Sequence, residues 1–408
     1  MNPDLSSNPR NNPRIPTLLD SFHIPTIILA ESVMPNTRVL NIQPGEDFTE
    51  AIAQAAQTLR SGGIVAFPTE TVYGVGARAD LPDAVARLRQ LKRRPDNKPF
   101  TVHLGRREIV ERFVPRFQGV GKRLVTKAWP GPLTLVFTGI DPATAPIMAD
   151  LPAHAAAQIY HEGTVGLRCP DDPTASALLN NLNQPVVAAS ANLAGKPPAK
   201  NADQALSALD GQADLILDGG TARYAKPSTV VKLNHTGYQI IRDGVFDHRT
   251  IKRLATLNIL LVCTGNTCRS PMAAALLRDL LARQLGVEPN SLDDRGINVQ
   301  SAGTFASAGA PASPQAVQAL KDREIDLTPH RSQPLTAELI NQADHIFTMT
   351  ESHQQAILQM APSAAQRVEP LDPQADIADP IGQHVNVYRA CADKIDAALQ
   401  HRLPEVLS

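Results

Sequence analysis

The sequence predicts an α/β protein with two domains, because apolar strand-like runs lie next to helical patterns in both halves of the 408-residue chain. In the second half, residues 257–262 (LNILLV) are typical of a buried parallel strand, and residues 271–277 have the composition of a helix. In the first half, residues 48–60 indicate an amphipathic helix that two glycines end, and residues 64–67 (IVAF) indicate a strand. Domains usually contain about 100–200 residues, so the chain has room for two cores.

Composition excludes several classes of function. The 40 acidic and 39 basic residues nearly cancel, so no global charge selects a nucleic acid or a membrane surface. Four cysteines without paired metal-ligand spacing argue against a disulfide scaffold and a structural zinc site, and they predict a reducing compartment, the cytoplasm. The apolar residues 24–30 are too few to span a bilayer, so we expect neither a membrane anchor nor a secretory signal. Residues 1–37, rich in Asn, Pro and Ser, are predicted to be a disordered tail.

Residues 263–270 (CTGNTCRS) lie between the predicted strand and helix of the second half and have the chemistry of an anion-binding loop. A strand that turns at once into a helix directs backbone N–H groups and the positive end of the helix dipole at the turn. We expect Ser270 to cap the helix and Pro271 to be its first residue. Gly265 and Asn266 are expected to adopt the positive φ angles of a tight loop.

Cys263 is the candidate nucleophile of this loop, and Arg269 is the candidate phosphate ligand. A free thiol has a pKa of about 8.5, and we expect the loop N–H groups and Arg269 to lower the pKa of Cys263. A guanidinium binds two phosphoryl oxygens and stabilises the charge that develops during transfer. We expect Ser270 to donate a hydrogen bond to the sulfur. The alternative, that Cys263 and Cys268 are only buried apolar residues, does not explain the arginine in the same loop.

The pattern of Cys, five residues, Arg, Ser and Pro resembles the low-molecular-weight protein tyrosine phosphatase family over residues 257–408. The resemblance implies a Rossmann-like three-layer α/β/α domain with a parallel sheet, a phosphocysteine intermediate and no cofactor. It assigns catalytic roles to Cys263, Arg269 and Ser270. The remaining residues of the phosphate loop are Thr264, Gly265, Asn266, Thr267 and Cys268, and residues 301–304 (SAGT) are expected to order this loop.

Two Asp-Pro pairs compete for the role of general acid in this domain. A general acid is needed because the leaving group departs poorly without a proton, and the same carboxylate then activates water. Asp379 is the first choice, since the following Pro, Ile and Gly match the place of the family's acid, and Asp372 is the second choice.

Substrate preference and redox behaviour depend on two positions within the loop. Thr267 makes the loop resemble the bacterial branch of the family that hydrolyses phosphoarginine, because a hydroxyl suits a polar guanidino phosphate. Ile381 stands where phosphotyrosine-specific members usually carry an aromatic residue. We therefore place phosphoarginine ahead of phosphotyrosine in a phosphoprotein substrate. Cys268 either forms a protective disulfide with Cys263 or only packs the loop, and both alternatives stay open.

Two segments of the first half combine residue types that suit a ligand site. Residues 68–76 (PTETVYGVG) join a rigid turn, hydroxyl groups and glycines, which lets backbone approach a ligand closely. Residues 91–99 (LKRRPDNKP) place four cations in a short stretch. Such a run is usually a solvated face, but the prolines that follow Lys92 and Arg94 favour an extended, loop-like course.

Five further short segments, taken with residues 68–76, resemble the YrdC-like threonylcarbamoyl-AMP synthase family across residues 38–250. The segments are residues 129–134 (WPGPLT), 165–170 (VGLRCP), 189–192 (ASAN), 227–231 (PSTVV) and 241–244 (IRDG). The resemblance implies an α/β domain with a twisted sheet and a basic cavity, where ATP, L-threonine and bicarbonate become threonylcarbamoyl-AMP and pyrophosphate. A tRNA-modifying transferase would use this product downstream.

The resemblance also assigns ligand roles to nine side chains of the first half. ATP would contact Lys92, Arg94, Ser190, Asn192, Ser228 and Arg242, and threonine would contact Thr69, His103 and Arg168, with Arg168 on its carboxylate. Mg²⁺ is expected on the phosphates of ATP, without protein side chains as ligands. An ordinary strand histidine is the alternative for His103.

A bifunctional enzyme is the preferred interpretation, and two others remain. The first half would be a non-catalytic RNA- or nucleotide-binding module, or the second half would be a redox-sensing or phosphoprotein-binding unit. The complete set of candidate residues in each half favours catalysis over binding.

Overall fold

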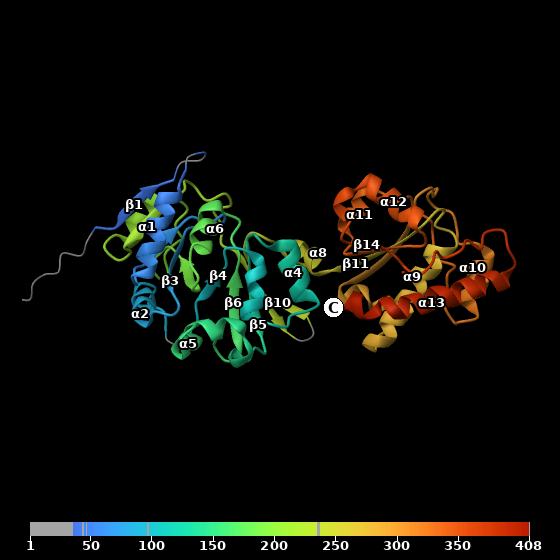
Figure 1. Ribbon diagram of the computed structural model, residues 1–408, viewed down its shortest axis with the longest axis horizontal. Helices are drawn as coiled ribbons and strands as arrows, with labels where there is room; N and C mark the ends of the chain where they lie inside the picture. The colour runs from blue at the N-terminus through green and yellow to red at the C-terminus, as the bar shows by residue number, and fades with distance from the viewer. Residues whose placement is uncertain (1–35, 43–44, 46, 96–97, 235–236, 408) are drawn as a thin grey trace, which may run out of the picture. The chain divides into compact units, whose positions relative to one another are not determined.

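The computed structural model describes residues 36–42, 45, 47–95, 98–234 and 237–407 (Figure 1). Of the predicted disordered tail, residues 1–35 lie outside these described residues. No helix in the described part of the chain is long and apolar enough to cross a membrane.

The first domain is built on a mixed sheet of ten strands in the order β1-β8-β2-β3-β7-β4-β6-β5-β9-β10. The strands are β1 (Arg38–Asn41), β2 (Val65–Phe67), β3 (Gly74–Arg78), β4 (Thr101–His103), β5 (Leu133–Thr138), β6 (Thr164–Arg168), β7 (Val186–Ser190), β8 (Leu215–Asp218), β9 (Thr229–Asn234) and β10 (Gly237–Arg242). The helices are α1 (Thr49–Arg60), α2 (Pro82–Leu91), α3 (Val110–Phe113), α4 (Val120–Ala128), α5 (Ala156–Ile159), α6 (Pro173–Asn180), α7 (Ala202–Leu209) and α8 (His248–Ala255).

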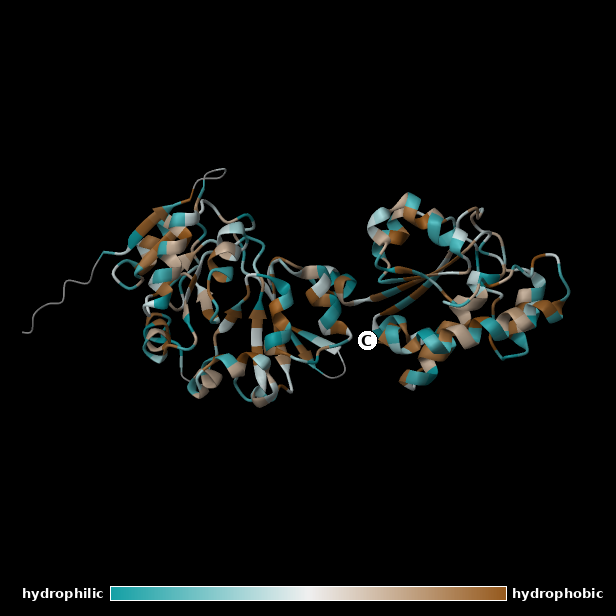
Figure 2. Cartoon of the chain, viewed as in Figure 1, coloured by the Kyte–Doolittle hydropathy of each residue, from teal (hydrophilic) through white to brown (hydrophobic). Residues whose placement is uncertain are grey.

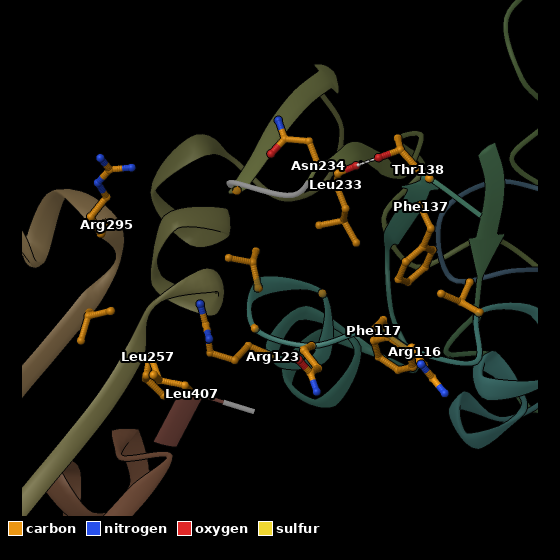
Figure 3. A pocket seen from close by; sticks show the side chains of 18 of the residues that line it. Arg116, Phe117, Arg123, Phe137, Thr138, Leu233, Asn234, Leu257, Arg295 and Leu407 are labelled. Atoms are coloured by element: carbon orange, nitrogen blue, oxygen red, sulfur yellow. Dashed lines mark hydrogen bonds between the residues drawn. The ribbon is translucent and has the colours of Figure 1, made fainter. Parts of the chain in front are cut away.

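Both faces of this sheet are buried, because successive side chains of a strand point to opposite faces. On β2, Val65 and Phe67 pack with α1 and α6 in one apolar cluster, whereas Ala66 belongs to the larger cluster that includes α2, α4 and α7. The apolar strands stand out in brown in Figure 2. Next to β5, Phe117 and Phe137 pack edge to face with ring centroids 5.6 Å apart (Figure 3).

The second domain has the predicted three-layer architecture around a parallel sheet in the order β12-β11-β13-β14. The strands are β11 (Leu257–Cys263), β12 (Ile297–Gly303), β13 (His345–Thr348) and β14 (Val368–Pro370), and the helices are α9 (Arg269–Leu285), α10 (Pro314–Lys321), α11 (Ala337–Gln342), α12 (Glu351–Met360) and α13 (Val385–Leu407). Helices α9, α10 and α13 cover one face, and α11 and α12 cover the other (Figure 1). Cys263, at the end of β11, faces the α9 side.

The four elements predicted from local pattern are present, but the helix expected to begin at Pro271 begins at Arg269 and extends to Leu285. The helix expected at residues 48–60 begins at Thr49, and the strand expected at residues 64–67 begins at Val65. Strand β11 extends one residue beyond the prediction, to Cys263. Ile251 and Ala255 of α8 join the core of the first domain, and one residue, Thr256, separates α8 from β11. The domain ranges 38–250 and 257–408 remain our proposal, and the packing of α8 favours extending the first range to residue 255.

Candidate active sites

The phosphate loop of the second domain connects β11 to α9 and encloses the sulfur of Cys263. Ser270 Oγ lies 2.9 Å from Cys263 Sγ, and the backbone N–H of Asn266 donates to the same sulfur at 3.3 Å. The prediction that Ser270 caps the helix is wrong, because α9 begins at Arg269 and Cys268 is its N-cap residue. The Ser270 hydroxyl instead lies within the first turn, where it contacts the sulfur.

Asn266 holds the loop in shape from a fully buried position. Its side-chain Nδ2 donates to Ser270 Oγ and to Ser301 Oγ, each at 2.9 Å, and its Oδ1 accepts from the backbone of Gln333. Its φ angle of 54° confirms the expected left-handed conformation. The same expectation is wrong for Gly265, whose φ is not positive and whose added Cβ would meet only Thr267 Oγ1, at 3.6 Å.

Residues 301–304 lie directly against the loop, as expected of a segment that orders it. A Cβ added at Gly303 would lie 2.4 Å from the carbonyl oxygen of Thr264 and 2.9 Å from the backbone nitrogen of Asn266. Glycine is therefore needed at position 303 for the close approach of two backbones.

Arg269 is 4% exposed and reaches the loop from the first turn of α9. Its Nη1 donates to the carbonyl oxygen of Ile377 at 3.1 Å, and its Nη2 donates to Thr264 Oγ1 at 3.3 Å and to Asp379 Oδ2 at 2.5 Å. Its Nε is buried and has no hydrogen-bond partner within the described residues. The guanidinium thus keeps one N–H available for a ligand.

The structure brings Asp379 to Arg269 and keeps Asp372 apart from it. The Asp379 side chain is 38% exposed, so solvent and a leaving group can reach it. Asp372 accepts from the backbone N–H of Gln374 at 2.9 Å and lies 3.6 Å from Lys394 Nζ. This is the geometry of a turn, and it favours Asp379 as the acid.

The pKa of the Cys263 thiol departs from our expectation. Burial raises this pKa, and burial is the largest contribution. The hydrogen bonds from Ser270 and Asn266 and the charge of Arg269 lower the pKa, as expected, but they do not outweigh burial. The sequence identified the groups that stabilise the thiolate and could not account for the burial of the sulfur.

Two further features of the loop bear on redox chemistry and substrate. Cys268 is a free thiol, 3.3 Å from Ser313 Oγ and 3.6 Å from the hydroxyl of Tyr388. Sequence reasoning missed Phe305, which is 86% exposed and whose backbone N–H donates to the carbonyl oxygen of Thr264 at 3.0 Å. The place of Phe305 directly after residues 301–304, the segment expected to order the loop, was the available signal in the sequence. Ile381, beside Asp379, is also exposed.

The candidate site of the first domain is a cavity of about 650 Å³ over one face of the sheet, because alternate residues along β4, β5 and β6 line it. His103, Arg168, Ser190 and Arg242 are the last residues of β4, β6, β7 and β10. Eight of the nine predicted ligand residues line this cavity, namely Lys92, Arg94, His103, Arg168, Ser190, Asn192, Ser228 and Arg242. Thr69 does not line it; this residue borders a neighbouring cavity of about 260 Å³.

Lys92 connects the end of α2 to the segment after β7. Its Nζ donates to the carbonyl oxygen of Ser190 at 2.7 Å, to that of Asn192, and to Asn192 Oδ1 at 3.2 Å. Ser190 Oγ donates to Asn192 Oδ1 at 2.5 Å. Burial, with a smaller contribution from Arg94, lowers the pKa of Lys92 to about 8.

Two arginines contribute further positive charge to the cavity. Arg94 donates to the carbonyl oxygens of Lys98 and Pro99, and its guanidinium lies 4.8 Å from the ring centroid of Phe100. Arg242 Nη2 donates to the carbonyl oxygen and the hydroxyl of Ser228, at 2.8 and 3.0 Å. Backbone carbonyls therefore hold both side chains in place before any ligand binds.

Arg168 is held at the cavity wall by residues 69–71. Its Nη2 donates to Thr71 Oγ1 at 2.5 Å, to Glu70 Oε1 at 3.1 Å and to Thr69 Oγ1 at 3.2 Å. Sequence reasoning missed Glu70, whose side chain is 1% exposed; its position in the segment that we singled out was the only signal. As in Arg269, the Nε of Arg168 is buried and lacks a partner within the described ranges.

His103 is a neutral acceptor at the cavity wall. Burial and the charge of Arg168 lower its pKa to about 3. Its Nδ1 lies 3.2 Å from the carbonyl oxygen of Thr101. Because a carbonyl oxygen only accepts, Nδ1 carries the proton and Nε2 keeps its lone pair.

At both sites, the described side chains that could bind a metal ion are not grouped. Across the residues that the structure describes, no cluster of three or more His, Cys, Asp or Glu side chains can hold a metal ion. No Asp or Glu is among the described residues that line the 650 Å³ cavity.

The fold and these sites define a two-domain α/β protein with a cationic centre in each domain. The family model Sua5_yciO_yrdC, described as telomere recombination, matches residues 57–244, and the low molecular weight phosphotyrosine protein phosphatase model matches residues 258–407. The chain belongs to both families, one in each domain.

Three relatives illustrate this combination of two domains. A protein-arginine-phosphatase of Geobacillus stearothermophilus is 42% identical over 154 residues, which cover 36% of this chain and 95% of that protein. A threonylcarbamoyl-AMP synthase of Cellvibrio japonicus is 33% identical over 190 residues, covering 47% and 94%. A threonylcarbamoyl-AMP synthase of Bacillus subtilis is 39% identical over 194 residues, covering 47% of this chain and 53% of that protein, so the chain spans about half its length.

The contact between Ser270 and Cys263 predicts a measurable change in thiol reactivity. Ser270→Ala removes a hydrogen bond that lowers the pKa of the thiol, so this pKa should rise and the thiolate fraction at pH 7 should fall. One net hydrogen bond is worth about 1 kcal/mol, which corresponds to about fivefold slower alkylation of Cys263 by iodoacetamide. Peptide mapping by mass spectrometry would follow Cys263 separately from the other cysteines. Unchanged or faster alkylation would show that Ser270 does not stabilise the thiolate.

Proposed function

We propose that the chain is a bifunctional enzyme, a threonylcarbamoyl-AMP synthase in residues 38–250 and a cysteine-dependent protein phosphatase in residues 257–408. One observation carries the proposal. Arg168 and Arg269 each bury an Nε that has no partner among the described residues. Buried polar groups are rarely left unpaired in proteins, and an anionic ligand would satisfy both donors.

In the synthase domain, the cavity supports binding of ATP and L-threonine. Lys92, Arg94 and Arg242 supply positive charge for the triphosphate, and Arg168 supplies donors for the threonine carboxylate. The neutral His103 offers an acceptor for the ammonium or hydroxyl of threonine. Ser190, Asn192 and Ser228 orient these cations, and their hydroxyl and amide groups are candidates for nucleotide contacts. Thr69 supports Arg168 instead of contacting threonine, because its hydroxyl donates to the carbonyl oxygen of Val72 at 2.6 Å.

The proposed reaction consumes ATP, L-threonine and bicarbonate. The threonine amine combines with bicarbonate to give a carbamate and water, and a carbamate oxygen then attacks the α-phosphorus of ATP. The bond between the α- and β-phosphates breaks and pyrophosphate leaves. Mg²⁺ would arrive on the phosphates as part of the substrate, because the described lining of the cavity offers no carboxylate to hold it.

In the phosphatase domain, the Cys263 sulfur attacks phosphorus and Arg269 stabilises the charge on the phosphoryl oxygens. Asp379 donates a proton to the leaving group and afterwards accepts one from the water that cleaves the phosphocysteine. A raised thiol pKa is compatible with this route. A neutral thiol and a phosphate dianion together carry the same number of protons as a thiolate and a phosphate monoanion. The thiol proton therefore passes to a phosphoryl oxygen as the sulfur attacks.

The rim of the loop supports a phosphoprotein substrate with a long side chain. Thr267 offers a hydroxyl next to the phosphate position, whereas Phe305 and Ile381 offer exposed apolar surface to the stem of the substrate. This combination suits phosphoarginine better than phosphotyrosine, because the guanidino group needs polar partners close to phosphorus.

The two other interpretations have less support. The relatives that match the two domains are named as a threonylcarbamoyl-AMP synthase and a protein-arginine-phosphatase, and a redox unit has no need for Asp379 beside Arg269. The four cysteines are free, which fits the cytoplasm as the expected compartment. A tRNA-modifying transferase as the consumer of threonylcarbamoyl-AMP, and RNA binding by the first domain, belong to the same proposal.

Two release assays on the full chain test both activities. We expect pyrophosphate release from ATP that requires both threonine and bicarbonate, and phosphate release from an aryl phosphate that Cys263→Ser abolishes. Each variant serves as the control for the other domain, so Cys263→Ser should leave pyrophosphate release unchanged, and Arg168→Lys should reduce only pyrophosphate release. Phosphoarginine and phosphotyrosine peptides then rank the substrates. Pyrophosphate release that ignores threonine, or phosphate release that survives Cys263→Ser, contradicts the corresponding assignment.

The pKa of Lys92 predicts a pH dependence of ATP binding. The ammonium is charged below its pKa of about 8 and loses its charge above it, so affinity for ATP should be highest below pH 8 and fall as pH rises through this value. The fall approaches at most tenfold per pH unit. Titration calorimetry with ATP alone avoids the ionisation of threonine and bicarbonate. Lys92→Arg is the control, because a guanidinium stays charged and should remove the inflection. An affinity that stays flat to pH 9.5 in the wild type would refute the assignment.

A further inference from the structure

His353 contacts the phosphate loop of the second domain although it lies about 90 residues from it in sequence, on α12. Its side chain is buried, with the residue 5% exposed. The ring Nε2 lies 2.9 Å from Thr264 Oγ1, and the ring Nδ1 lies 2.7 Å from Thr350 Oγ1. Thr350 is the N-cap residue of α12, and its hydroxyl also accepts from the backbone N–H of His353. The imidazole is therefore fixed at both ring nitrogens.

The Thr264 hydroxyl that His353 contacts also contacts the catalytic arginine. Thr264 Oγ1 accepts from Arg269 Nη2 at 3.3 Å, and a guanidinium can only donate. The single hydroxyl hydrogen of Thr264 is then available to His353 Nε2, while Nδ1–H donates to Thr350. Thr264 is exposed, so without this partner its hydroxyl would be free to turn toward water.

We propose that His353 is a positioning residue of the phosphatase reaction, which fixes the Thr264 hydroxyl as an acceptor and thereby aims the guanidinium of Arg269 at the phosphoryl group. The inference rests on the phosphatase function proposed above. Other side chains support the loop at different points. His330 Nε2 lies 2.7 Å from the carbonyl oxygen of Asn266, and Ser313 and Tyr388 contact the Cys268 sulfur. These contacts hold the loop itself, whereas His353 acts on Arg269 through one hydroxyl.

The role of His353 is one of orientation and not of charge. Burial and the positive charge of Arg269 lower the pKa of His353 to about 4, against smaller opposite effects of Asp379 and Asp376. The imidazole is neutral near pH 7, so it accepts from Thr264 without repelling the guanidinium.

Three variants of the full chain test the inference by steady-state hydrolysis of an aryl phosphate. His353→Ala should lower kcat about tenfold with KM changed less than about threefold, since a correctly aimed Arg269 matters most in the transition state. His353→Gln should recover most of this loss, because its amide oxygen can accept from Thr264. His345→Ala is the matched control. It removes a half-buried histidine of the same domain, which pairs with Glu405 and stacks on Phe347, and kcat should stay within twofold of the wild type.

A second measurement does not depend on turnover. Titration calorimetry with inorganic phosphate should give weaker binding for His353→Ala than for the wild type, with His345→Ala unchanged. If the wild type hydrolyses no phosphate ester, the proposed function fails, and the phosphate titration alone decides the role of His353. If His353→Ala does not fold, Thr264→Val replaces it and should show the same loss of kcat. Adding His353→Gln to Thr264→Val should then cause no further loss of kcat.

The outcomes separate positioning from a merely structural role. A selective fall in kcat with rescue by glutamine supports the inference. A kcat of His353→Ala within twofold of the wild type overturns it. Equal losses in His353→Ala and His345→Ala, or no rescue by glutamine in a protein with the wild-type unfolding temperature, overturn it as well.

Discussion

Both sites depend on a buried guanidinium that protein acceptors hold at one end and whose Nε has no partner among the described residues. Burying a charge is costly unless an opposite charge and hydrogen bonds compensate it. Arg168 meets this requirement with Glu70 at 3.1 Å, and Arg269 meets it with Asp379 at 2.5 Å. In each case the Nε donor is left over, and an oxyanion of the substrate is the group that would complete the arrangement. The cavity walls and the loop shield these two N–H donors from water and hold them in a fixed direction.

The carboxylates that pair with the two arginines differ in a way that matches their proposed roles. Glu70 is 1% exposed and also accepts from the backbone N–H of Asp171 at 3.1 Å, so it is fixed in the protein interior. Asp379 is 38% exposed and sits on a loop at the rim. A fixed carboxylate suits the static task of orienting a substrate-binding arginine. An accessible carboxylate can leave the arginine and exchange protons with a leaving group and with water.

The amount that the sequence could predict follows from how local each feature is. The phosphate loop, its strand and its helix are contiguous in sequence, so Cys263, Ser270 and Arg269 were found from their spacing. Glu70 and His353 gain their roles from contacts with residues about 90 to 100 positions away, which no local pattern reveals. Burial is also a tertiary property, and it reverses the expected direction of the Cys263 pKa. The expected contact of Ser270 with the sulfur is present at 2.9 Å, but local preference could not show that α9 begins before Ser270, at Arg269.

A crystal structure of the full chain with phosphate and L-threonine bound would test the central claim most directly. The account predicts a phosphate oxygen within hydrogen-bond distance of Arg269 Nε, and a threonine carboxylate oxygen within hydrogen-bond distance of Arg168 Nε. Anions bound at other places, with both Nε atoms still unpaired, would contradict the account.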